Sequence, residues 1–190
     1  MSNIYQDVMV DIETTGTQPN RSAMIQLAAV KFNLEDFTVS PNFFNRSLSI
    51  PAWRYWDEDT REWWSKMPDV FSSIMQKAED PAIVMRDFAD WSIQINGPPL
   101  RFWAKPTTFD FMFVTSYLKD FKQPIPFDFR EATDMNSYLR GRYAPNPIDR
   151  SDEPKMSGTA HDAIHDSLHQ IKVLFHHEQK ARNAKSSANN

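Results

Sequence analysis

Hydrophobic residues recur along this chain in short runs that alternate with longer amphipathic segments, and this order is typical of an α/β fold. The runs predict strands at residues 8–12, 24–32, 43–48, 100–104 and 127–129. The second run is nearly continuous in apolar residues, so we expect it near the centre of the sheet. The amphipathic segments predict helices ending at Trp64, Ala78, about Asn96, Phe121 and Arg142, followed by a long helix towards Arg182.

Aspartates placed just before several of these segments predict where the helices begin. The expected N-terminal caps are Asp57 or Asp59 for the first helix, Asp69 for the second and Asp80, which precedes a proline, for the third. The next two helices are expected to begin at Phe109 and Met135.

The segment before the last helix and the end of the chain are expected to lie outside regular structure. Residues 143–155 contain three prolines and predict a long mobile loop, which is either functional or a solvated connector. Residues 183–190 are polar and are expected to form a disordered tail. The prediction is therefore a single domain over residues 1–182 followed by this tail.

Composition narrows the class of protein. A chain of 190 residues with 41% hydrophobic content can form one substantial core. Its net charge of −4 argues against a nonspecific nucleic-acid coat protein. The absence of cysteine excludes disulfides and fits a reducing cytoplasm, and no apolar stretch has membrane-spanning length. We therefore expect a soluble, cytoplasmic protein that does not bind membranes.

The first candidate chemistry is the pair Asp11 and Glu13 at the end of the first strand. Side chains alternate between the faces of a strand, so these two carboxylates project together, whereas Val8, Val10 and Ile12 project from the opposite face. Neighbouring carboxylates repel each other unless a proton or a cation neutralises them. Mg²⁺ or Mn²⁺, which prefer oxygen ligands, would fit this pair.

Two further segments complete the candidate site. Asp110 is expected in the first turn of a helix, and His161 precedes Asp166 by five residues at the start of the last helix. Positions five apart on a helix are separated by about 140°. His161 must therefore lie before the helix or at its beginning, with Asp166 inside it. An apolar stripe formed by Ile164, Leu168, Ile171 and Phe175 would pack this helix on the core.

In this order, the motifs resemble those of the DEDDh 3′-5′ exonuclease superfamily, in particular the phage exodeoxyribonuclease A and bacterial ribonuclease AS type. The resemblance covers about residues 7 to 176 and includes the pair Trp63 and Trp64. It implies a mixed five-stranded, ribonuclease H-like sheet flanked by helices. One departure is the approach to Asp110, where many relatives have His-Asn and this chain has Trp103-Ala104-Lys105-Pro106.

The resemblance implies a two-metal phosphodiester hydrolase that releases nucleoside 5′-monophosphates from single-stranded 3′ ends. Asp11, Glu13 and Asp166 would bind one Mg²⁺ or Mn²⁺, and Asp11 would bridge to a second ion that Asp110 helps to place. His161 would take a proton from the attacking water. The expected partner is single-stranded DNA, with RNA as the alternative, and a homodimer remains open.

The expected substrate contacts come from two segments and one aromatic residue. In the superfamily, residues after Glu13 line the pocket of the terminal nucleotide, which implicates Thr14, Thr15 and Gly16. Trp63, Trp64 and Phe109 offer aromatic faces to bases. Neighbours on a helix point about 100° apart, so one of the two tryptophans is expected to pack inward.

Two alternatives remain from the sequence alone. His161, His165 and His169 recur every four residues, a spacing that can bind zinc, although the chain has no cysteine to complete such a site. Alternatively, the chain is a catalytically idle nucleic-acid-binding module, for example one associated with a polymerase. Loss of a metal ligand would favour that hypothesis, but all five acid and histidine positions are present.

Overall fold

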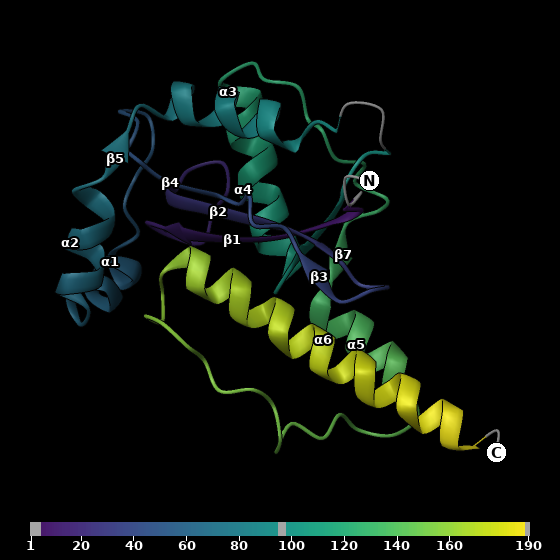
Figure 1. Ribbon diagram of the computed structural model, residues 1–190. Coiled ribbons are helices and arrows are strands. Elements are labelled where there is room, and N and C mark those ends of the chain that lie inside the picture. Colours follow the sequence, from purple (N-terminus) through teal and green to yellow (C-terminus); the bar gives the residue numbers. More distant parts are fainter. Residues whose placement is uncertain (1–4, 95–97, 189–190) are drawn as a thin grey trace.

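Strands and helices alternate along residues 5–94 and 98–188, the part of the chain that the computed structural model describes (Figure 1). The strands are β1 (Asp7–Thr14), β2 (Met24–Asn33), β3 (Thr38–Val39), β4 (Phe44–Leu48), β5 (Ala78–Glu79), β6 (Arg101–Ala104) and β7 (Thr133–Asp134). The helices are α1 (Glu58–Ser65), α2 (Pro68–Met75), α3 (Pro81–Ser92), α4 (Thr107–Asp120), α5 (Met135–Tyr143) and α6 (Ala163–Ala188). The predicted α/β class is confirmed. Within the described residues, no helix combines the length and the hydropathy needed to cross a membrane.

One mixed sheet forms the centre of the molecule, with the strand order β5-β4-β2-β1-β6-β7 and β3 beside β2. β2 is antiparallel to β1, β3 and β4, whereas β6 is parallel to β1 and β7. The four long predicted strands are present, and β2 is internal as expected. The sheet has seven strands rather than five because three two-residue strands extend its edges.

The predicted strand at residues 127–129 is wrong. Phe127 is buried, but it packs from a loop against Phe102 with ring centroids 5.1 Å apart. The edge position beside β6 belongs instead to Thr133 and Asp134. The apolar character of residue 127 therefore reflects core packing and not strand pairing.

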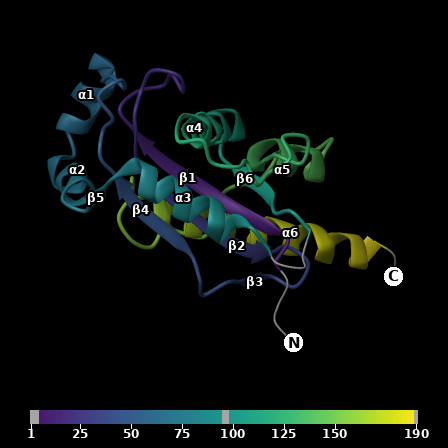
Figure 2. The same cartoon turned by 90° about the horizontal axis from the view of Figure 1, so that it is seen from above.

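Two layers of side chains cover the two faces of the sheet. Val8, Val10 and Ile12 of β1 face the core that α3 and α4 share. Met9 faces the second core, to which α5 and α6 contribute. In Figure 2, seen from above, α3 lies over the sheet and α6 runs beneath it. The period of two along β1 thus places Asp11 and Glu13 on the face that α6 covers.

Several helix boundaries differ from the expected ones. Asp57, one of the two aspartates predicted to cap the first helix, caps α1 through its side chain. Asp69 does not cap α2, because this helix begins at Pro68 and Asp69 lies in its first turn. α2 then ends at Met75, since Ala78 pairs with β4. α3 ends at Ser92, earlier than the predicted end near residue 96, which lies outside the described residues.

The segment between α5 and α6 runs along α6 rather than away from it (Figure 1). Glu153 lies 2.7 Å from Nε2 of the fully buried His177, and Lys180 Nζ donates to Asp152 at 2.9 Å. These contacts hold the segment against α6, whereas the prolines predict a mobile loop.

α6 continues as a helix through residue 188, where the sequence predicts a disordered tail from residue 183. Arg182 fixes the preceding turn, because it donates to the carbonyls of Leu34 and Glu35 at 3.0 and 2.8 Å. Extending a helix that has already formed costs little free energy, because the unfavourable nucleation step is complete. The Ser187 hydroxyl also donates to the carbonyl of Asn183 within this last turn.

A chain that ends at Arg182 is expected to melt within about 1 °C of the full chain, because Ala181 is the last buried residue and the described side chains beyond Arg182 are exposed. A chain that ends at Lys180 loses this burial and the Arg182 hydrogen bonds, so its Tm should fall by roughly 3–6 °C. Calorimetry on both truncations measures the difference. Equal losses of Tm would contradict a domain that ends near residue 182.

Candidate active site

The end of β1 places two carboxylates on the face that α6 covers. Glu13 is 8% exposed, and Oδ1 of Asp11 accepts a 2.7 Å hydrogen bond from Nε2 of Gln170 on α6. The opposite face of the same strand carries the apolar residues of the first core. The shared direction of Asp11 and Glu13 is therefore the one expected from strand alternation.

Helix α4 supplies the third carboxylate from its first turn. Asp110 is 4% exposed and lines the same cleft as Asp11 and Glu13. This cleft has a volume of about 340 Å³, and its remaining lining residues are Ile12, Lys105, Pro106, Phe109, His161, Asp166 and Gln170. Phe109 is half-buried beside Phe113, with ring centroids 4.9 Å apart, and presents its other side to the cleft.

His161 lies outside α6 and Asp166 lies inside it, as the helical geometry requires. His161 adopts a left-handed backbone conformation with φ of +62°, and its amide donates to Oδ2 of Asp166 at 2.9 Å. Glu13, His161 and Asp166 each offer a ligand atom, and these atoms lie within 4.8 Å of one another. Two segments far apart in the sequence, the end of β1 and residues 161–166, thus meet at one point.

Burial and mutual repulsion disfavour the ionised forms of these carboxyl groups when no cation is bound. The pKa of Asp11 is well above its usual range because of burial and the charges of Asp110 and Asp166. The pKa of Glu13 rises to about 10 because of burial and the charges of Asp11 and Asp166. Burial also raises the pKa of Asp110, to about 8, and that of Asp166. Divalent cations would remove this repulsion, and a donor set dominated by carboxylate oxygens fits Mg²⁺ or Mn²⁺.

The histidine ladder does not converge in the same way. Nδ1 of His165 accepts the amide of Thr159 at 3.2 Å and lies 3.6 Å from Asp162. Within the part of the chain that the structure describes, the group able to hold a metal contains His161 but neither His165 nor His169. We therefore assign the ladder no zinc.

The two tryptophans of α1 have different surroundings, as their 100° separation predicts. Trp64 is 3% exposed, and its Nε1 donates to the carbonyl of Thr14 at 2.9 Å. Trp63 is 36% exposed, and its ring lies edge-on to His161 with centroids 4.8 Å apart. Trp63 is thus available to a base beside the cleft, whereas Trp64 supports the end of β1.

The residues after Glu13 are largely committed to the fold. Thr15 is fully buried, its hydroxyl donating to the Tyr55 carbonyl and accepting the Ala23 amide. A Cβ on Gly16 would lie 2.4 Å from Ser22 Oγ and 2.7 Å from Asp57 Cβ. The small size of Gly16 therefore permits close packing against Ser22 and Asp57, and its expected contact with a nucleotide stays a prediction. Thr14 is 8% exposed and donates to the carbonyl of Gly16, and neither threonine lines the cleft.

Sequence reasoning missed Gln170. This residue is 8% exposed and lines the cleft, and it contacts Asp11 directly. Its position four residues after Asp166 places both side chains on the same face of α6. That spacing was the available signal, but a glutamine in a polar helix does not stand out by itself.

Comparison with known proteins gives one family and many solved structures. A family model described as the 3′-5′ exoribonuclease Rv2179c-like domain matches residues 6–176. No curated protein sequence matches the chain significantly.

Three of the similar solved structures have sequence identities to this chain of 13–15%, which show a likeness of fold alone. The E. coli exonuclease I in complex with single-stranded DNA has a TM-score of 0.66 and 15% identity over 97% of this chain and 44% of its own. The nuclease domain of 3′hExo, a DEDDh family member bound to rAMP, has a TM-score of 0.66 and 13% identity over 93% of both chains. The S. pombe Pop2p with Mg²⁺ and Mn²⁺ has a TM-score of 0.66 and 13% identity over 90% of this chain and 82% of its own. This chain spans less than half of the exonuclease I chain.

Mn²⁺ is expected to stabilise the protein more at about pH 8.5 than at about pH 6. The unfolded chain releases the Glu13 proton near pH 4.5, whereas the metal-free folded protein holds it up to about pH 10. Between these values the folded state binds more protons, so its stability falls as pH rises, and a cation that binds the ionised carboxylates restores it. With Mn²⁺ at about 100 times its Kd, Tm should rise by roughly 5–10 °C.

Thermal melts with Mn²⁺ or chelator at both pH values test this expectation. Asp90→Asn, which alters an exposed carboxylate on α3, is the control and should keep the full response. A Tm increase that does not depend on pH, or one that persists in Asp11→Asn, would contradict binding at this cleft.

Proposed function

The chain belongs to the Rv2179c-like 3′-5′ exoribonuclease domain family, and on that premise we propose that it is a metal-dependent 3′-5′ exonuclease that releases nucleoside 5′-monophosphates from single strands. The observation that carries this proposal is the convergence of Asp11, Glu13, Asp110 and Asp166 with His161 around one cleft. A catalytically idle binding module would not need this set.

The carboxylates would hold two Mg²⁺ or Mn²⁺ ions. Asp11, Glu13 and Asp166 would bind the first ion, and Asp11 would share the second with Asp110. Two such ions, when bound, stabilise the attacking and the leaving oxygen of a phosphodiester. The hydrogen bond from Gln170 orients Asp11 for this shared role.

His161 would receive the proton of the attacking water. His161 lines the cleft and precedes α6. The hydrogen bond from its amide to Asp166 holds its backbone in place. The edge-on contact with Trp63 limits the directions that the ring can adopt. A base held in one orientation can accept the proton without reorganisation.

Trp63, Phe109 and Lys105 are the proposed contacts with the strand. The exposed face of Trp63 would stack on a base, a contact worth about 1 to 3 kcal/mol. Phe109 lines the cleft, and the exposed ammonium of Lys105 at its edge would contact a phosphate.

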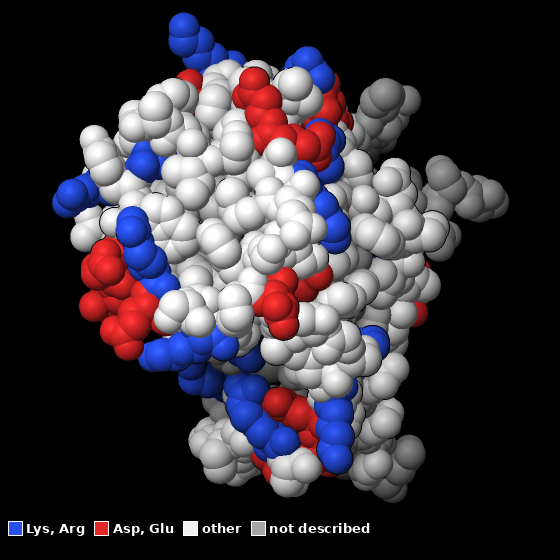
Figure 3. All heavy atoms as spheres, turned by 90° about the vertical axis from the view of Figure 1, so that its left-hand side faces the viewer, with Lys and Arg blue, Asp and Glu red and all other residues white. Residues whose placement is uncertain are grey.

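Long-range attraction of the strand is expected to be weak. Figure 3 shows the side on which α1 and α2 lie, where charged groups of both signs surround a broad uncharged area. The described part of this face carries no continuous basic surface. Attraction to phosphate would therefore depend on the cations of the cleft and on Lys105.

We propose single-stranded RNA as the substrate, because the matching family model is described as that of an exoribonuclease. This departs from the lean to DNA that the sequence suggests. Single-stranded DNA is the second candidate, favoured by the fold shared with the E. coli exonuclease I of the DNA complex. Matched 5′-labelled RNA and DNA, incubated with Mn²⁺ or chelator, compare the two and reveal the direction of degradation.

Asp11→Asn is expected to reduce hydrolysis below detection, because the variant loses the charge shared by both ion sites while keeping the shape of the side chain. Product release from the labelled RNA, measured on protein that melts cooperatively, gives the effect. Asp90→Asn should retain the wild-type rate. Undiminished hydrolysis by Asp11→Asn with Mn²⁺ would refute the assignment of the site.

His161→Ala is expected to lower kcat by roughly 10²- to 10⁴-fold, the usual loss when a general base is removed. His176→Ala removes an imidazole from α6 beside Asp152, away from the cleft, and serves as the control. Rates over a range of pH should show a flatter profile for His161→Ala. A profile and rate equal to those of the wild type would exclude His161 as the base.

A further inference from the structure

Gln26 of β2 lies directly opposite Glu13 of β1 in the antiparallel register. Opposed residues of such a pair share one face of the sheet, so the Gln26 side chain lies beside the candidate metal site on the α6 side. It is 4% exposed. A buried carboxamide needs partners for its oxygen and for both hydrogens.

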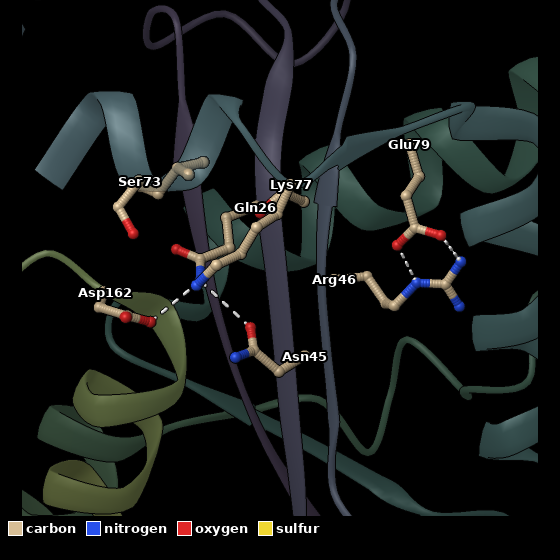
Figure 4. Close-up of a pocket in the computed structure, with 9 residues that line it drawn as sticks. Gln26, Asn45, Arg46, Ser73, Lys77, Glu79 and Asp162 are labelled. Carbon is tan, nitrogen blue, oxygen red and sulfur yellow. Dashed lines mark hydrogen bonds and ion pairs between the residues drawn. The ribbon is translucent and has the colours of Figure 1, made fainter.

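Three hydrogen bonds satisfy this side chain, and Figure 4 shows the two that its Nε2 donates. Nε2 donates to Oδ1 of Asp162 at 2.9 Å and to Oδ1 of Asn45 at 3.1 Å, and Oε1 accepts the amide of Ala163 at 3.1 Å. Asn45 belongs to β4, and Ala163 is the first residue of α6. One side chain therefore ties two strands of the sheet to the beginning of the helix.

Asp162 and Ala163, which Gln26 holds, belong to residues 159–163, the elbow that carries His161 into the cleft. The left-handed conformation of His161 is uncommon for a residue other than glycine and has to be held by its surroundings. Asp162 adds to the elbow by accepting the amide of Asp166 on its backbone carbonyl at 3.0 Å. Shifting Asp162 or Ala163 would therefore move both His161 and Asp166.

Gln26 supplies the hydrogen bonds between this elbow and the sheet. The other hydrogen bonds of residues 159–163 found in the described structure run within the elbow or to α6, as from Thr159 to His165 and from His161 to Asp166. Apolar contacts such as Ile164 with its core hold the helix but do not fix hydrogen-bond geometry at its first residue.

We propose that Gln26 is a positioning residue for His161 and Asp166, acting through Asp162 and Ala163. This inference rests on the proposed exonuclease function. In the absence of the Gln26 carboxamide, the elbow would lose its fixed distance from Glu13 while the binding surface for the strand stays intact. The expected signature is a loss in kcat with little change in KM.

Gln26→Met tests the proposal, because methionine has a similar length and forms none of these hydrogen bonds. We expect kcat on labelled RNA to fall by roughly 10- to 100-fold, the usual range for residues that orient a site, with KM changed less than about threefold. Asn45→Ala removes the partner on β4 but keeps both bonds to the elbow, so its kcat should stay within about threefold of the wild type.

Exchanging the carboxamide of Gln26 and the carboxylate of Asp162 provides a test by rescue of kcat. Gln26→Glu places a carboxylate against Asp162 and should lower kcat, whereas the double variant Gln26→Glu with Asp162→Asn restores a donor and an acceptor in reversed order. We expect kcat of the double variant to be at least about tenfold higher than kcat of Gln26→Glu. Rescue would exclude a general effect of substitution in the core, and no recovery relative to Gln26→Glu would overturn the proposal.

Hydrogen exchange supplies a measurement that does not depend on catalysis. In Gln26→Met the amides of residues 159–166 should exchange at least about tenfold faster, whereas those of β1 should stay protected. Unchanged exchange in the elbow, or a wild-type kcat for Gln26→Met, would overturn the role of Gln26. Inactivity of the wild-type protein would instead refute the proposed function, and faster elbow exchange would still establish the structural tie.

Discussion

Carboxyl groups packed within one buried cleft repel each other as soon as they ionise, and the rest of this structure depends on how that repulsion is contained. Glu13 and Asp110 are buried, and the raised pKa values of Asp11, Glu13 and Asp110 mean that burial and neighbouring charges disfavour their ionised forms. The fold tolerates this arrangement because its stability comes from cores elsewhere. Bound divalent cations would relieve the same repulsion, so the destabilising feature would also serve the proposed function.

The two cores on either side of the sheet determine the geometry of the cleft. Val8, Val10 and Ile12 fix the face of β1 against α3 and α4, so Asp11 and Glu13 must point to the other side. The stripe of Ile164, Leu168, Ile171 and Phe175 packs α6 on that side and fixes its rotation. Asp166 and Gln170, one turn apart on the same helix, consequently meet the end of β1. The position of each acid therefore follows from apolar packing at some distance from it.

His161 has to be positioned in another way, because it belongs to no helix or strand. Its left-handed backbone is held by hydrogen bonds at both ends of a short elbow, from Asp166 on α6 and, through Asp162 and Ala163, from Gln26 on β2. The two tryptophans divide their tasks in a similar way. Trp64 is buried and supports Thr14, which leaves the more exposed Trp63 beside the imidazole. His161 and Trp63 are thus held in place through hydrogen bonds that lie wholly or partly inside the protein.

The sequence by itself determined what depends on local geometry. The period of two placed Asp11 and Glu13 on one face, and the 100° turn of a helix excluded His161 from α6 and separated the two tryptophans. The cap of α1 was narrowed to two aspartates, of which Asp57 is the one observed. The tertiary structure alone decided the contacts between distant residues. Gln26 and Asp162 are 136 positions apart, and Asp11 and Gln170 are 159 apart. Thr15 bonds to Tyr55 and is buried, and this contact could not be read from the sequence, where the family resemblance implied contact with a nucleotide. The apolar run near Phe127 forms no strand, since Thr133 and Asp134 fill that edge. Periodicity reports which face of an element is buried, but not which polar group on another element it will meet there.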